Sequence, residues 1–241
     1  MKTHTIEIVV AKYQEDISWL SQLSPLIKRT VYDKGEAGAS NSLPNIGRES
    51  HTYLHHIITR HEELSDLTIF SQGGSPEDAP ALSSILNALA NNLSAILAKE
   101  KFYMDLAPVI QEFSLNATWE RDKKHETLGD LVKHLFDIQA EDKKYFSRGH
   151  AIFAVNKNNI FKHPISFYEK ALKSVSHSID PQEGHFMERL WKTLLSSPEC
   201  YDVAQKPGEW REIIETDGVT VKRPIPFPFD EEVAGSLFVT Q

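Results

Sequence analysis

Short β-branched runs recur along the chain and predict the strands of a sheet. Each run is followed by glycine, proline or charged residues, which mark the point where a strand gives way to a turn. The first run starts almost at the beginning of the chain, and the third ends abruptly at two glycines. The predicted strands are residues 6–11, 30–32, 67–71 and 151–155.

Between these runs, apolar side chains recur every three or four residues, which gives a helix one apolar face. Strands that alternate with helices predict an α/β fold, with an open, mostly parallel sheet flanked by helices. The predicted helices are residues 15–23, 49–60, 80–101, 128–136, 165–174 and 184–195.

The chain after residue 195 is rich in proline, glycine and charged residues and has no helical or strand period. We therefore expect one domain over residues 1–195, with residues 196–241 as an extended C-terminal segment packed on it. No internal repeat or low-complexity linker divides the chain further.

Composition narrows the class of protein. A net charge of −8 over 241 residues argues against a broad surface for nucleic acid, although it is compatible with a local basic pocket. The single cysteine, Cys200, excludes an internal disulfide framework and a multi-cysteine zinc site. No segment is long enough for a membrane span or a signal peptide. The sequence predicts a cytoplasmic protein with no integral membrane segment, and it fixes no oligomeric state.

One polar run, residues 45–56, combines a turn signal, an arginine, a carboxylate and three histidines between two predicted strands. Arg48 follows Gly47 near a predicted helix N-terminus, where backbone N–H groups and the helix dipole favour anions. A guanidinium there makes a good diphosphate contact. The alternative is an ion pair between Arg48 and Glu49 or Glu62.

The ends of the first two strands also carry polar side chains, where open α/β sheets bind ligands. Tyr13 could stack on a planar base, and Asp16 could accept a hydrogen bond from a base or ribose. Alternatively, Glu15 and Asp16 cap a helix. Asp33 occupies the ribose-binding position after the second strand, or it belongs to an ordinary turn.

The histidines of the polar run raise the question of a metal. His51 and His55 are four residues apart, which is zinc-ligand spacing on a helix, but the glutamate of the HExxH motif is absent. His150 or His185 could supply a third ligand through the fold. One interpretation is that these histidines bind a metal ion in a metal-dependent hydrolase. The other is that they contact substrate or support the structure.

A second polar and aromatic cluster covers residues 184–191. Glu188 lies between apolar and aromatic residues, which could raise its pKa towards that of a general base. An ion pair with Arg189 or a nearby lysine is the alternative. His185 and Trp191 are candidates for contact with an acceptor.

These segments resemble an uncharacterised family found in bacteria, fungi and large viruses, which is related to the GT-A glycosyltransferases and is similar to a chlorella-virus rhamnosyltransferase domain. The resemblance covers roughly residues 6–195, and residues 45–54 are its most specific part. The resembling segments are residues 8–20, 31–35, 44–54 and 184–191.

The resemblance implies a GT-A-like sheet and a nucleotide-sugar donor. Tyr13 and Asp16 would face the base, Asp33 the base or ribose, and Arg48 the diphosphate. Glu188 would deprotonate the acceptor hydroxyl in an inverting transfer to a glycan or other hydroxyl acceptor.

The sequence departs from the GT-A pattern after the third strand. GT-A enzymes usually carry Asp-x-Asp there to hold a divalent metal, whereas this chain has Gln72, Gly73 and Gly74. We place Gln72 in the nucleotide-sugar site, and a requirement for manganese or magnesium stays open. The missing carboxylates also leave a non-catalytic nucleotide- or carbohydrate-binding module as an alternative.

Overall fold

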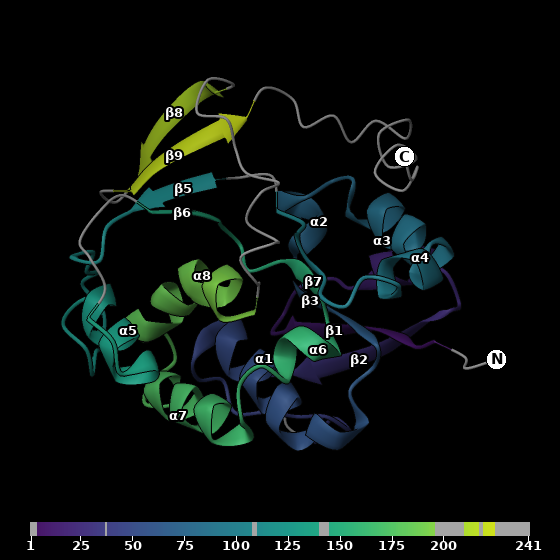
Figure 1. Cartoon of the computed structure of the whole chain (residues 1–241), viewed down its shortest axis with the longest axis horizontal. Helices are drawn as coiled ribbons and strands as arrows, with labels where there is room; N and C mark the ends of the chain where they lie inside the picture. The colour runs from purple at the N-terminus through teal and green to yellow at the C-terminus, as the bar shows by residue number, and fades with distance from the viewer. Residues whose placement is uncertain are drawn as a thin grey trace.

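The central sheet has five strands in the order β2-β1-β3-β7-β4 (Figure 1). Strand β1 (Ile6–Lys12) lies between β2 (Ile27–Asp33) and β3 (Leu67–Gln72) and is parallel to both. Strand β7 (Phe153–Asn156) is antiparallel to β3 and to β4 (Tyr103–Asp105), so β4 again runs in the direction of β1. The α/β prediction is confirmed, with a mixed sheet in which one strand is reversed.

This computed structural model describes the greater part of the chain. No helix within the described residues is long and apolar enough to cross a membrane. The described residues are 4–36, 38–107, 110–139, 145–195, 210–216 and 219–224.

Helices cover both faces of the central sheet (Figure 1). Successive β1 side chains point to opposite faces, so Val9 joins one core cluster and Ile8 and Val10 the other. The first cluster packs under α1 (Arg48–Thr59), α5 (Leu128–Phe136), α7 (Ile165–Val175) and α8 (Gln182–Leu195). The second packs under η1 (Ser18–Gln22), α3 (Leu82–Asn91) and α4 (Leu93–Leu97). Three short elements complete the helices: η2 (His61–Glu63), α2 (Ser75–Asp78) and α6 (Lys157–Ile160).

One charged side chain lies within the sheet layer. Glu7 on β1 is 1% exposed and accepts hydrogen bonds from Thr30 at 2.5 Å and Ser65 at 3.1 Å, with the Lys28 ammonium 3.0 Å away. Burial alone would raise the pKa of Glu7, but these donors and charges hold the pKa below its ordinary value.

A second, antiparallel sheet has the order β6-β5-β9-β8. Its strands are β5 (Ile110–Phe113), β6 (Tyr145–Arg148), β8 (Trp210–Thr216) and β9 (Val219–Pro224). The sequence predicted only an extended segment after residue 195. Within that segment β8 and β9 form a hairpin, and β9 pairs with β5. Residues 196–209 and 225–241, with Cys200, lie outside the described residues.

Two predicted helices differ from the observed elements. The helix expected at residues 15–23 is only η1, because the Asp16 carboxylate accepts hydrogen bonds from the backbone and side chain of Ser18 and holds a local turn. The helix expected at residues 80–101 is divided into α3 and α4 at Asn92, whose side-chain amide donates to Ala88 O. The predicted helix at residues 128–136 is confirmed as α5.

Candidate active site

Two polar segments far apart in the sequence meet beside the carboxyl ends of the parallel strands. Arg48 Nη1 donates to Asp180 Oδ1 at 3.1 Å and lies 3.4 Å from His185 Nε2, 137 residues along the chain. Arg121 Nε donates to the other oxygen of Asp180 at 2.8 Å. Asp180 therefore holds two guanidinium groups close together, and the two clusters singled out in the sequence form one site.

An unusual backbone conformation directs Arg48 into this site. Gly47 and Arg48 both have positive φ, +65° and +52°, immediately before the regular turns of α1. The N–H of Gly47 donates to Ser178 O at 2.8 Å, which ties this bend to the segment before α8. The Arg48 side chain then lies against Gly184, where a Cβ would come within 2.8 Å of Arg48 Cδ. Both glycines are thus needed for the position of the arginine.

A buried cation lies beneath the same bend. Lys34 follows β2 directly, and its ammonium donates to Ile46 O at 2.6 Å and to the carbonyl oxygen of Arg48. Burial, with a further contribution from the charge on Arg48, lowers the pKa of Lys34 to about 8. Lys34 was not predicted as a site residue, because an Asp-Lys-Gly sequence also suits an ordinary turn.

A strained turn forms the neighbouring wall of the site. His150 and Ala151 have φ of +65° and +46°, and with Arg48 they are three of the four non-glycine residues of positive φ in the described part of the chain. The His150 N–H donates to Glu188 Oε1 at 2.7 Å, and the amide of Gln72 donates to His150 O at 2.9 Å. Backbone strain of this kind is retained at functional sites, where the surrounding contacts enforce it.

The predicted rise in the pKa of Glu188 is wrong. Burial acts in that direction, but the charge on Arg189, the His150 N–H and the charge on Arg48 together outweigh it and lower the pKa. Arg189 Nη1 lies 3.8 Å from Glu188 Oε2, so the ion-pair alternative is present. Glu188 is therefore an ionised carboxylate at neutral pH, next to Arg48 and His185.

At the ends of β1 and β2, Asp33 Oδ2 pairs with the Lys12 ammonium at 2.5 Å. Asp33 Oδ1 accepts from the backbone N–H groups of Gly35 and Glu36, which is the turn arrangement. The hydrogen bond from the Lys12 ammonium has the largest effect on the pKa of Asp33. It holds that pKa below its ordinary value, although burial acts in the opposite direction. Tyr13 is 43% exposed, at the position where the sequence expected a stacking side chain.

His51 and His56 of α1 are buried and His55 is half-buried, and they are not arranged as ligands. His51 is 7% exposed, and burial, with the charges on Lys34 and His55, lowers the pKa of His51 to about 4. The His51 and His55 rings lie parallel with centroids 6.4 Å apart. Among the described residues, no group of three His, Cys, Asp or Glu side chains is arranged to hold a metal ion. The hydrolase alternative thus gains no support from this part of the chain.

The side chains at and after the end of β3 are engaged in contacts within the protein. The amide of Gln72 is directed to His150 O, and Asp78 pairs with the His150 ring at 3.3 Å. The Glu15 carboxylate lies against Gly73, where a Cβ would meet Glu15 Oε2 at 2.9 Å, and accepts from the Tyr13 N–H. These residues do not suit a divalent ion bridging a diphosphate.

Trp191 does not lie where an acceptor could reach it. The ring is 1% exposed and packs between Tyr53 and Phe153, with centroid distances of 5.8 and 5.5 Å. Trp191 is a core residue in this structure, contrary to its predicted contact with an acceptor.

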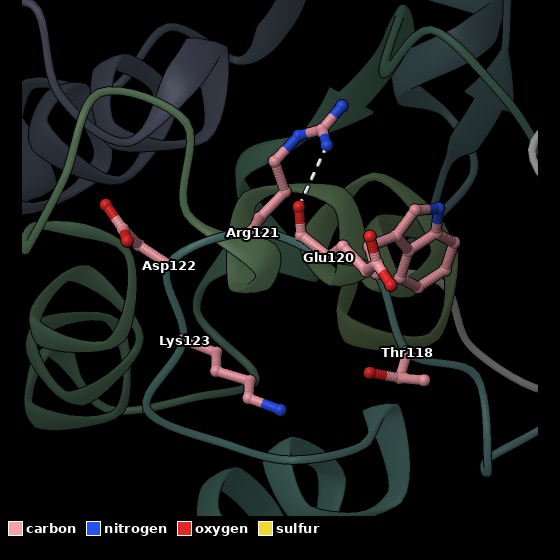
Figure 2. Close-up of a pocket in the computed structure, with 6 residues that line it drawn as sticks. Thr118, Glu120, Arg121, Asp122 and Lys123 are labelled. Carbon is pink, nitrogen blue, oxygen red and sulfur yellow. Dashed lines mark hydrogen bonds between the residues drawn. The ribbon is translucent and has the colours of Figure 1, made fainter.

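Trp119, Arg121 and Asp180 were not singled out in the sequence. Arg189 lies with its guanidinium carbon 4.4 Å from the centroid of the Trp119 ring, and the His185 ring is parallel to Trp119 with centroids 6.0 Å apart. A pocket of about 540 Å³ is lined by residues 118–123, including Arg121 (Figure 2). Asp180 precedes a proline at the start of α8, a helix-start signal that could have drawn attention to it.

The described side chains thus supply an anion site more readily than a metal site. Arg48, Arg121 and Lys34 bring three cationic side chains together, with His185 as a further donor.

The sequence model of a family described as "Protein of unknown function (DUF3431)" matches residues 8–207. No curated protein matches the chain.

Proposed function

The chain belongs to the DUF3431 family, whose description gives no activity, and we propose that it is a glycosyltransferase that uses a nucleoside-diphosphate sugar. The proposed fold is GT-A-like, and the proposed acceptor is a glycan or another hydroxyl compound. The observation that carries the proposal is the Arg48–Asp180–Arg121 cluster beside the carboxyl ends of parallel strands. The nucleotide sugar itself comes from the resemblance of residues 8–20, 31–35, 44–54 and 184–191 to a family related to the GT-A glycosyltransferases.

Arg48 is well suited to a diphosphate. Its Nη1 is held by Asp180, but its Nε has no hydrogen-bond partner although it is buried, and Glu49 lies 3.6 Å from that nitrogen. The Arg48–Glu49 ion pair that the sequence offered as the alternative is therefore present, but its separation is beyond hydrogen-bond distance and leaves the Nε–H free to donate. A buried donor without a partner costs about 1–3 kcal/mol, which a bound phosphate oxygen would recover.

The nucleoside would extend from Arg48 towards the ends of β1 and β2. In this proposal Tyr13 stacks on the base and Asp33 accepts from a ribose hydroxyl. The Lys12 ammonium fixes the Asp33 carboxylate in an ionised form. Asp16 and Gln72 border the same edge of the sheet and contact the donor from either side.

The proposed reaction is a single displacement. The acceptor oxygen forms a bond to the anomeric carbon while the bond from that carbon to the diphosphate oxygen breaks, and the diphosphate leaves with the electron pair. The acceptor proton passes to the carboxylate of Glu188. Arg48 and Arg121 stabilise the charge that develops on the leaving group.

Asp105 is an alternative proton acceptor, because its environment raises its pKa whereas that of Glu188 lowers the pKa. Asp105 ends β4, is 12% exposed, and accepts from the Tyr103 hydroxyl at 2.8 Å with Lys192 at 4.0 Å. Burial raises the pKa of Asp105 despite these partners. Since a general base works best when its pKa is near the working pH, Glu188→Gln and Asp105→Asn should be compared by pH–rate profile.

Binding is the first test of the proposal. A thermal-shift screen of nucleoside diphosphates, with and without manganese, should show stabilisation by one base, about 2.7 kcal/mol at a ligand concentration of about 100 Kd. Arg48→Gln should abolish the shift. Arg60→Gln is the matched control, because Arg60 lies at the other end of α1 and its side chain is 48% exposed.

The outcome separates the candidate functions. If no nucleoside diphosphate stabilises the protein, or if Arg48→Gln keeps the full shift, the proposal is wrong. If a nucleotide sugar binds but its sugar is never transferred or released, the chain is a binding module instead. Stoichiometric zinc that survives dialysis would favour the hydrolase.

A further inference from the structure

The pocket lined by residues 118–123 borders the proposed diphosphate site. Arg121 belongs to both, because it lines the pocket and its Nε donates to Asp180, which also holds Arg48. Figure 2 shows Arg121 directed away from the side on which Thr118 and Lys123 lie, with its guanidinium bonded to the carbonyl of Glu120. The pocket therefore opens next to the position of a reacting diphosphate.

Two side chains of α8 fasten the segment that forms this pocket. Gln182 is 0% exposed; its Oε1 accepts from the Thr118 hydroxyl at 2.8 Å and from the Trp119 N–H, and its amide nitrogen donates to His125 O at 2.7 Å. Glu183, also 0% exposed, accepts from the N–H of Lys124 at 2.6 Å and of His125 at 2.7 Å. The pocket is consequently preformed, which lowers the entropic cost of binding.

Trp119 gives this pocket an aromatic surface. The ring is half-buried, and Arg189 and His185 of α8 hold it in place, together with Phe186 at a centroid distance of 5.3 Å. Since Arg189 is itself 4% exposed, the ring rests on a rigid base rather than on a mobile side chain.

The remaining side chains of the pocket are polar and carry no net charge. Glu120 and Asp122 are exposed and balance Arg121 and Lys123, the last of which pairs with Glu126 at 2.6 Å. The Asp122 side chain points away from the side on which Glu120 lies (Figure 2). One aromatic ring with the Glu120 carboxylate as an acceptor suits a sugar, which has an apolar C–H face and a rim of hydroxyl donors. Two carboxylates do not suit a second phosphate.

We propose that this pocket is the acceptor subsite and binds a terminal neutral sugar, with its C–H face on Trp119 and its hydroxyls donating to Glu120. This inference rests on the proposed function, since Arg121 places the sugar beside the leaving diphosphate. It moves the aromatic acceptor contact from Trp191, which is buried, to Trp119.

The test uses the full chain and ligand-observed saturation-transfer NMR with methyl glycosides of rhamnose, glucose, galactose and mannose. At least one glycoside should receive saturation at its ring C–H protons. Trp119→Ala should weaken its binding roughly tenfold, and Trp119→Phe should restore most of it. Because Trp119→Ala could unfold the segment, Glu120→Gln at an exposed position provides an independent variant. Glu62→Gln, 95% exposed beyond the far end of α1, is the control.

Nucleoside-diphosphate binding is measured on the same variants. If a nucleotide binds but no glycoside does, or if every pocket variant binds the glycoside like the parent, this inference fails while the proposed function stands. If the Trp119 variants lose nucleotide rather than glycoside, the pocket belongs to the donor and the inference is wrong. If the glycoside binds at Trp119 and no nucleotide binds, the sugar site stands and the proposed transfer fails.

Discussion

Two buried histidines of α1 should make the protein sensitive to mild acid. His51 is 7% exposed and His56 is 1% exposed, and burial lowers the pKa of each from 6.5 to about 4. His56 Nδ1 lies 3.1 Å from the Tyr32 hydroxyl, which suits a neutral ring. Protonation in the folded protein would place a charge in a core that cannot solvate it, whereas the unfolded chain binds the proton readily.

The sign and size follow from these pKa values. Because the folded pKa values lie below the unfolded ones, the stability is fully present above about pH 6.5 and is lost as the pH falls towards about pH 4. Between about pH 7.5 and about pH 5, each histidine removes roughly 2 kcal/mol from the free energy of unfolding. Together His51 and His56 remove roughly 4 kcal/mol, which is a large part of the free energy of unfolding of a typical domain, about 5–15 kcal/mol.

Urea unfolding followed by tryptophan fluorescence at both pH values measures this loss. Glu49 and Asp105, whose pKa values are raised, act in the opposite direction, so the comparison between variants is more informative than the parent alone. His56→Gln cannot be protonated and should lose about 2 kcal/mol less than the parent over this interval. His4→Gln, at an exposed position, should lose as much as the parent. If His56→Gln loses the parent's full amount, His56 is not a buried neutral side chain and the reasoning is refuted.

Three other substitutions test the site and the fold. Gly184→Ala should push the Arg48 side chain aside, so that nucleoside-diphosphate binding measured by calorimetric titration weakens about tenfold although the charge of Arg48 is kept. Gly74→Ala, where the added Cβ meets nothing closer than 3.7 Å, should leave binding unchanged in that titration. Gln182→Ala should lower the free energy of unfolding by about 1–3 kcal/mol in urea, because it leaves buried backbone groups without partners. Glu7→Ala should cost about 1–3 kcal/mol at neutral pH and abolish the part of acid unfolding that begins as the pH falls below about 4.5, whereas an unchanged acid transition would contradict its lowered pKa.

Local signals account for most of the elements that the sequence predicted. Helix α5 has the predicted limits because Thr127 and Asp130 form a capping box at its start. Strand β4 was missed because three residues, Tyr103–Asp105, are too short to show a period. The reversal of β7 was also hidden, since its direction is set by pairing with β3 more than 80 residues earlier, as in Phe70 with Phe153.

The site was predictable only as separate parts. Arg48 could be singled out, because Gly47 and a helix start favour an anion contact at that position. Its partner Asp180 lies 132 residues away, and Arg121 reaches Asp180 across 59 residues, so no spacing in the sequence reveals the cluster. The environment of Glu188 was misjudged partly for the same reason. Arg189, whose charge lowers the pKa of Glu188 most, is adjacent and was named as a possible ion-pair partner, but the His150 N–H that adds to this effect is 38 residues earlier.

Glu7 has a consequence for how the chain selects its strand alignment. Thr30 on β2 and Ser65 just before β3 approach its carboxylate from the two sides of β1. If β1 slipped by one residue, Glu7 would turn to the opposite face, among apolar side chains of the second core cluster such as Ile27, Ile69 and Leu86, and away from Thr30 and Ser65. The carboxylate therefore penalises misaligned sheets that an entirely apolar strand would tolerate, and it fixes the edge at which Lys12 and Asp33 end side by side.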